Sequence, residues 1–168
     1  MTSGGVEPSN RSIATPAPTS VVLNAWTVDG GAERARDRLI ELFAEANRPV
    51  SITLARDGAE LTRAIGEALA ARVDTLVVGG GDGTLSTAAA ALAGTSTRLG
   101  VLPLGTLNHF AKDLGIPLGL DEAARVVLAG HTTRVDAGEV NGKVFLNNSS
   151  LGLYPRVLRL RERHPARG

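Results

Sequence analysis

The chain has 168 residues, a formal net charge of +1, 43% hydrophobic residues and 21% charged residues. This length suits one domain and the beginning of a second, and the composition supports a packed core. Nucleic acid is not an expected partner, because the charge is balanced and only 3% of the residues are aromatic. The absence of cysteine excludes disulfides, thiolate metal sites and a cysteine nucleophile. No apolar run is long enough to cross a bilayer and the start lacks a secretory signal, so we expect a cytoplasmic protein.

Residues 1–19 are rich in Ser, Thr, Pro and Gly without hydrophobic periodicity, which predicts a disordered leader. From residue 20 to residue 131, short apolar runs alternate with segments of helical periodicity. This alternation predicts a three-layer α/β/α domain around a parallel sheet. The expected strands are 21–23, 50–55, 75–78 and 99–102, and the expected helices are 32–46, 61–69, an Ala-rich helix ending at Gly94, 107–114 and 121–129.

The pattern changes after residue 131, where two strand-like segments flank a turn. Thr133–Val140 and Lys143–Asn148 enclose Asn141-Gly142, the strongest short signal for an antiparallel hairpin. A hairpin cannot bury its apolar face alone. Residues 132–168 are therefore expected to begin an antiparallel β domain that this chain leaves incomplete.

The segment Gly79–Thr84 carries the most chemical information, because it follows a buried strand and opens a helix. Glycines let a ligand approach the main chain, and the N-terminus of a helix favours an anion such as phosphate. Thr84 supplies a hydroxyl for a helix cap or a phosphate contact. Asp82 would repel a bare phosphate, so it indicates either a nearby cation such as Mg²⁺ or loop N–H groups as its partners. A tight structural turn is the alternative, and the pattern matches neither the Walker A nor the Gly-x-Gly-x-x-Gly sequence.

A second loop, Pro103–Asn108, also joins a strand to a helix. Thr106 or Asn108 is expected to cap that helix, and Gly105 with Thr106 to close over the same ligand. Asn24 at the end of the first strand and Thr53 late in the second are weaker candidates for the rim of the site, and either residue read alone favours a structural role. Histidines at metal-ligand spacing and a Gly-x-Ser-x-Gly sequence are both absent, which disfavours a zinc site and a serine hydrolase.

Together, Gly80–Thr84 and the run Gly100–Pro117 resemble the diacylglycerol kinase catalytic domain family, which includes bacterial lipid kinases and the sphingosine and ceramide kinases. The resemblance covers roughly residues 20–155. NAD kinases and phosphofructokinases share the glycine–aspartate motif, whereas the second run favours the lipid kinases. The resemblance implies an ATP-binding α/β domain over residues 20–131 and a β-sandwich domain that begins at residue 132.

The resemblance also implies which residues hold the nucleotide and where the chain departs from the family pattern. Ala25 stands where the family has proline, and His109 stands where many members have aspartate. Asp82 is the candidate ligand for Mg²⁺. Asp136, Asn147 and Gly152 fit the family's entry into the second domain. The implied nucleotide-binding residues are Asn24, Thr53, Gly80, Gly81, Asp82, Gly83, Thr84, Leu85, Ser86, Gly105 and Thr106.

The function implied by the resemblance is transfer of the γ-phosphoryl group of ATP to a lipid hydroxyl, with Mg²⁺, at a membrane surface. Diacylglycerol is one such lipid, and a peripheral membrane location and a homodimer are options left open. The general base is expected beyond residue 168, so this chain alone is expected to be a weak or inactive catalyst. Alternative hypotheses are a kinase for NAD or another small molecule, a non-catalytic nucleotide-binding module, and a structural interaction domain.

Overall fold

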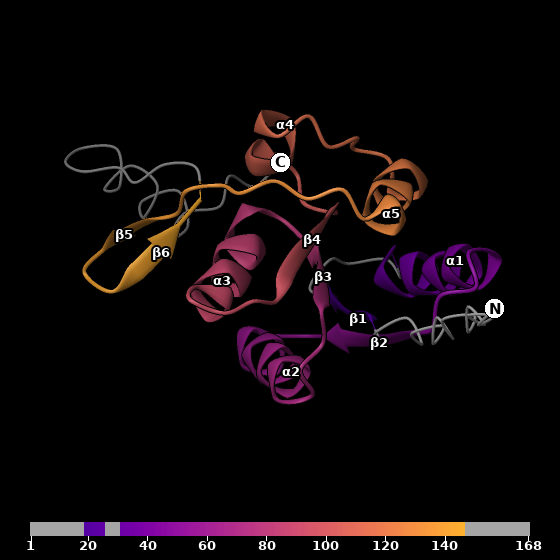
Figure 1. Cartoon of the computed structure of the whole chain (residues 1–168), viewed down its shortest axis with the longest axis horizontal. Helices are drawn as coiled ribbons and strands as arrows, with labels where there is room; N and C mark the ends of the chain where they lie inside the picture. Colours follow the sequence, from indigo (N-terminus) through magenta and orange to yellow (C-terminus); the bar gives the residue numbers. More distant parts are fainter. Residues whose placement is uncertain (1–18, 26–30, 147–168) are drawn as a thin grey trace, which may run out of the picture.

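The computed structural model describes residues 19–25 and 31–146, and its centre is a parallel sheet of four strands (Figure 1). The strands follow the order β2-β1-β3-β4. Helices cover both faces of this sheet, so both faces of its strands must be apolar. The strands are β1 (Thr19–Asn24), β2 (Val50–Ala55), β3 (Thr75–Gly80) and β4 (Arg98–Pro103).

Five helices cover the two faces of the sheet: α1 (Gly31–Glu45), α2 (Gly58–Ala70), α3 (Asp82–Leu92), α4 (His109–Asp113) and α5 (Leu120–Ala129). α1 and α5 pack on one face, whereas α2, α3 and α4 pack on the other (Figure 1). Crossovers between parallel strands are right-handed. The step from β1 to β2 and the step from β2 to β3 run in opposite directions across the sheet, so α1 and α2 lie on opposite faces.

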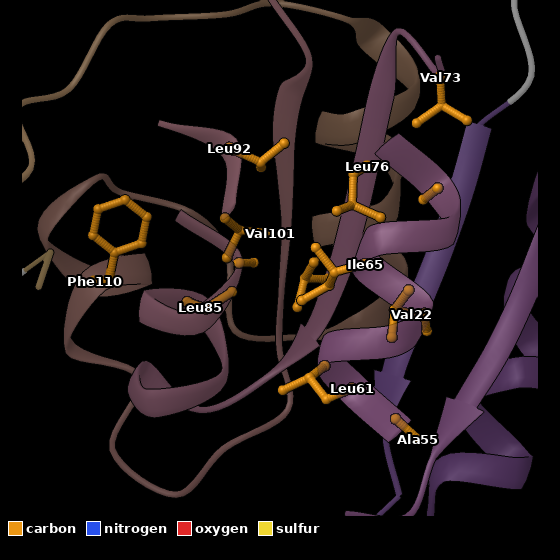
Figure 2. Close-up of a cluster of buried hydrophobic side chains, with 14 of the residues drawn as sticks. Val22, Ala55, Leu61, Ile65, Val73, Leu76, Leu85, Leu92, Val101 and Phe110 are labelled. Atoms are coloured by element: carbon orange, nitrogen blue, oxygen red, sulfur yellow. The ribbon is translucent and has the colours of Figure 1, made fainter. Parts of the chain in front are cut away.

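Two apolar clusters, one on each face, hold these layers together. Figure 2 shows the first, in which Leu76 of β3 packs among residues that include Ile65 of α2 and Leu85 of α3. The second contains Val77 of β3 and Phe43 of α1. Burying a side chain of this size contributes about 1.5–3 kcal/mol, and these five side chains are all almost fully buried. The predicted three-layer α/β/α fold is confirmed.

The predicted hairpin is present but short, with β5 (Gly138–Val140) paired antiparallel to β6 (Lys143–Phe145). Asn141 and Gly142 both have positive φ, 50° and 75°, as a two-residue type I′ turn requires. The expectation that the first strand starts at Thr133 was wrong, because residues 133–137 are exposed and lie outside any strand. The predicted end of the second strand, 147–148, lies outside the described residues. So does the predicted leader, except for Thr19, which opens β1.

None of the helices in the described part of the chain is long and apolar enough to cross a membrane.

An ion pair joins the two helices that cover one face of the sheet. The guanidinium of Arg38 on α1 donates to Asp121 on α5, with a distance of 2.7 Å between Nη2 and Oδ2. Its Nη1 also donates to Glu41, one turn further along α1, at 2.7 Å. The hydrogen bond from Arg38 lowers the pKa of the Asp121 carboxyl, and the hydrogen bond to Asp121 raises the pKa of Arg38.

We predict that Asp121→Asn lowers the thermal unfolding midpoint at pH 7 by a few degrees at most, since exposed ion pairs contribute little. Asp121 has a lowered pKa in the folded state, so its contribution is present above the pKa of an unfolded aspartate, about 4, and is lost as the pH falls below it. The midpoint difference from the wild type should therefore narrow between pH 7 and pH 3.

Asp37→Asn is the matched control, because Asp37 pairs with its neighbour Arg36 on α1. The prediction would be contradicted if Asp121→Asn and Asp37→Asn lowered the unfolding midpoint equally. It would also be contradicted if the decrease caused by Asp121→Asn did not change with pH.

Candidate functional site

The candidate site lies where the chain leaves β1 and β3, two neighbouring strands whose following helices lie on opposite faces of the sheet. Open α/β sheets bind ligands outside the carboxyl ends of their strands at such a divergence. Asn24 ends β1 and Gly80 ends β3. The topology therefore brings the predicted glycine loop to the position in this fold that is suited to a ligand.

The glycine loop is a direct passage from strand to helix. β3 runs to Gly80, two residues beyond the predicted strand, and α3 begins at Asp82. Gly81 is the N-cap residue and has no side chain to accept a helix N–H group. The first bond of the helix joins the amide of Leu85 to the carbonyl of Gly81 at 3.1 Å. The amides of residues 82–84 therefore have no partner inside the helix.

Thr84 is held inside the loop by two neighbours. Its Oγ1 accepts a hydrogen bond from Nδ2 of Asn24 at 2.9 Å, across the divergence between β1 and β3. A Cβ atom on Gly80 would lie 2.7 Å from the Thr84 side chain, so only glycine fits there. Thr84 is 7% exposed and does not cap α3, contrary to one of its two expected roles. Its hydroxyl hydrogen remains available for donation.

Two residues at the end of the motif differ in their surroundings. Leu85 is fully buried in the core cluster, as Figure 2 shows, and its amide is used by the helix. Leu85 therefore packs α3 against the sheet. Ser86 is half-buried in the first turns of α3.

The second predicted loop touches the first at the level of the main chain. The amide of Leu104 donates to the carbonyl of Gly80 at 3.2 Å, just beyond the pairing of Gly80 with Pro103. A Cβ atom on Gly105 would lie 2.3 Å from the Cα atom of Gly81. The two loops approach so closely that position 105 excludes a side chain, whereas a Cβ atom on Gly81 would lie 3.4 Å from the Cα atom of Gly105, an ordinary contact.

The prediction that Thr106 or Asn108 caps α4 was wrong. Asn108 occupies the N-cap position with φ of 52°, but its buried side chain turns back into the loop. Its Oδ1 accepts from the amide of Gly105 at 2.9 Å, and its Nδ2 donates to the carbonyl of Gly105 at 2.7 Å. Thr106 is exposed at the surface of this loop.

The first turn of α4 is capped by Asp82 from the other loop. Its Oδ2 accepts from the amide of His109 at 3.1 Å, and its Oδ1 accepts from the amide of Phe110 at 2.9 Å. The sequence predicted either a cation or main-chain N–H groups as the partner of Asp82, and the structure shows the N–H groups. The sequence did not identify them, because the residues lie 27 and 28 positions apart.

Thr53 is half-buried on β2, where it pairs with Val22 of β1. Because β1 lies between β2 and β3, Thr53 sits one strand further from the glycine loop than Asn24 does. The structure therefore brings Asn24, but not Thr53, into hydrogen-bond contact with this loop.

The departure from the family pattern at Ala25 has a structural consequence. The amide of Ala25 donates to the carbonyl of Ala55 at 2.7 Å, which extends the ladder between β1 and β2 by one hydrogen bond. Proline has no N–H group and could not make this bond.

The described residues contain no cluster of three side chains that could hold a divalent cation by themselves. Among residues 19–25 and 31–146, no group of three His, Cys, Asp or Glu side chains is arranged to hold a metal ion. Both carboxylate oxygens of Asp82 already accept amide hydrogen bonds.

We predict that Gly105→Ala destabilises the protein by about 1–3 kcal/mol, because its methyl group must displace the main chain of Gly81. Gly58→Ala is the matched control, since a Cβ atom there meets nothing within 4 Å. Urea unfolding of both variants provides the measurement. Equal stability of the two variants would mean that the loops do not touch.

Comparison with known proteins agrees with this arrangement. The family described as "Diacylglycerol kinase catalytic domain" matches residues 18–140. A protein of Pseudomonas aeruginosa named "Probable lipid kinase YegS-like" is 46% identical over 116 residues, which cover 67% of this chain and 38% of that protein. A protein of the same name from Citrobacter koseri is 33% identical over 150 residues, which cover 86% of this chain and 49% of that protein.

Among solved structures, a diacylglycerol kinase from Bacillus anthracis str. Sterne superposes with a TM-score of 0.68 at 29% identity, over 78% of this chain and 46% of that one. The chain spans less than half the length of the curated relatives described above. A family match over most of the chain, related sequences and a shared fold lead to one conclusion: the chain belongs to the diacylglycerol kinase catalytic domain family.

Proposed function

We propose that this chain binds ATP and forms the nucleotide-binding part of a lipid kinase. Membership of the family supports the reaction class, and the relatives named above are called probable lipid kinases. The observation that carries the proposal is the start of α3. It offers the amides of residues 82–84, without a side-chain cap, at the divergence of β1 and β3.

Several residues of the two loops have a proposed part in binding the phosphates. Gly83 offers its amide and open space, because a Cβ atom added to it would meet nothing within 4 Å. Thr84 donates its hydroxyl hydrogen while Asn24 holds its oxygen. Thr106, exposed beyond Gly105, provides the second hydroxyl. Gly80 leaves room for the side chain of Thr84, and Gly105 permits the close approach of the second loop to Gly81. Thr53 and Ser86 are candidates for the rim.

The acceptor that we propose is the hydroxyl of a lipid such as diacylglycerol, presented at a membrane surface. Phosphoryl transfer depends on positioning and charge neutralisation more than on covalent chemistry. Mg²⁺ bound to ATP would neutralise phosphate charge. The described residues contain no cluster of three ligands for such an ion, so no step is assigned to a metal held by them. This chain covers less than half of the relatives named above, and we propose that the general base that takes the lipid hydroxyl proton lies in the part of them that it does not cover.

We predict that the chain binds ATP with Mg²⁺ in calorimetry, and that it transfers little radiolabelled phosphate from ATP to diacylglycerol in mixed micelles. Absence of ATP binding would contradict the proposed function. Rapid transfer would contradict the placement of the base. Transfer to NAD but not to lipid would favour the small-molecule kinase instead.

We also predict that Gly83→Ala weakens ATP binding about tenfold without loss of stability. The added methyl group meets no protein atom, but it would obstruct one or two amide–phosphate contacts, each worth about 1 kcal/mol. Calorimetry and thermal unfolding measure the two effects separately. Gly66→Ala, at an equally open position inside α2, is the control that should leave ATP affinity unchanged. An equal ATP affinity of the two variants would exclude the amide of Gly83 from the site.

A further inference from the structure

We infer that Asp82 is a positioning residue, whose carboxylate fixes the loop of residues 103–108 against the glycine loop. The inference rests on the proposed function, because its consequence is the spacing of the two loops that would hold the phosphates. In this role, the negatively charged carboxylate of Asp82 accepts hydrogen bonds from main-chain N–H groups of the protein itself.

The first argument is the way in which the carboxylate is used. Asp82 lies in the first turn of α3, yet both of its oxygens accept amides from the first turn of α4, those of His109 and Phe110. A carboxylate that accepts backbone N–H groups makes strong, charge-assisted hydrogen bonds. Asp82 therefore joins the starts of two helices that follow neighbouring strands.

The second argument is that α4 has no cap of its own. Asn108 stands at the N-cap position, but its side chain is fully engaged with Gly105 and with the carbonyl of Pro103. The two side chains have complementary tasks: Asn108 sets the internal shape of the loop, and Asp82 anchors its end.

The third argument is the location of the anchored segment. The loop is fixed at its beginning by strand pairing of Gly80 with Pro103, and in the middle by the contact between Gly81 and Gly105. The bonds from Asp82 fix its far end. Thr106 lies between the second and third of these points, so its position relative to the glycine loop depends on Asp82.

A ligand for a divalent cation is the competing role for this carboxylate. Among the described residues, no further His, Asp or Glu side chains join it in a cluster of three. The two roles predict different behaviour of Asp82→Asn, because asparagine keeps an acceptor oxygen for capping and loses the charge that a cation needs.

The test compares D82A and D82N with the wild-type chain by amide hydrogen exchange and by ATP titration at several Mg²⁺ concentrations. D82A should increase exchange over residues 104–112 about tenfold and weaken ATP binding about tenfold, which is the cost of losing a cap. D82N should restore part of both, because asparagine keeps one of the two acceptor oxygens, and its dependence on Mg²⁺ should be unchanged. D57A is the matched control, because the carboxylate of Asp57 also caps a helix, its own helix α2, through the amide of Glu60. It should affect exchange at the start of α2 only.

Unchanged exchange over residues 104–112 in D82A would overturn the inference. It would also be overturned if D82N bound ATP as weakly as D82A and lost the dependence on Mg²⁺. If the wild-type chain binds no ATP, the proposed function fails, and hydrogen exchange still decides whether Asp82 holds the loop. Should D82A fail to fold, D82S takes its place, because its side chain is one bond shorter and has a single oxygen.

Discussion

The structure around the candidate site depends on a steric constraint: the main chains that follow β3 and β4 touch. A Cβ atom on Gly105 would lie 2.3 Å from the Cα atom of Gly81, and one on Gly80 would meet Thr84. Parallel strands bring their carboxyl ends to the same edge of a sheet, but they do not by themselves make the following loops meet. Here the absence of a side chain on Gly105 allows the contact, and the two loops lie against each other.

The glycine–aspartate motif contains both buried residues, which shape the loop, and an exposed one. Leu85 is fully buried, Thr84 is held by Asn24, and Asp82 reaches across to α4. Gly83 alone in the motif is exposed, and a Cβ atom added to it would meet nothing within 4 Å. Much of the motif therefore builds the loop, and the part open to a ligand is the main chain at the start of α3.

Local features of the structure were predictable from the sequence, and contacts between distant segments were not. The four strands were found because strands covered on both faces must be apolar, and the turn at Asn141-Gly142 because both residues tolerate positive φ. The extension of β3 to Gly80 was missed, since glycine normally indicates a loop. Glycine at position 79 of this strand is explained by crowding, because a Cβ atom there would lie 2.5 Å from the side chain of Leu23.

The same limit explains the errors in the second loop and the hairpin. Capping residues are normally sought within a few positions of the helix start, and the residue that caps α4 lies on another element. The length of a hairpin strand depends on its partner, which the pattern of residues 133–137 does not reveal. Thr53 remains a prediction, because the structure brings it near the edge of the sheet without joining it to either loop.

Two hydrogen bonds hold the end of β1 where the chain leaves the sheet. On one side the side chain of Asn24 donates to Thr84, and on the other the amide of Ala25 donates to the carbonyl of Ala55. A proline at position 25 would remove the second bond and leave the first. The link from β1 to the glycine loop is therefore independent of the residue at position 25, and the loop keeps this support with either residue there.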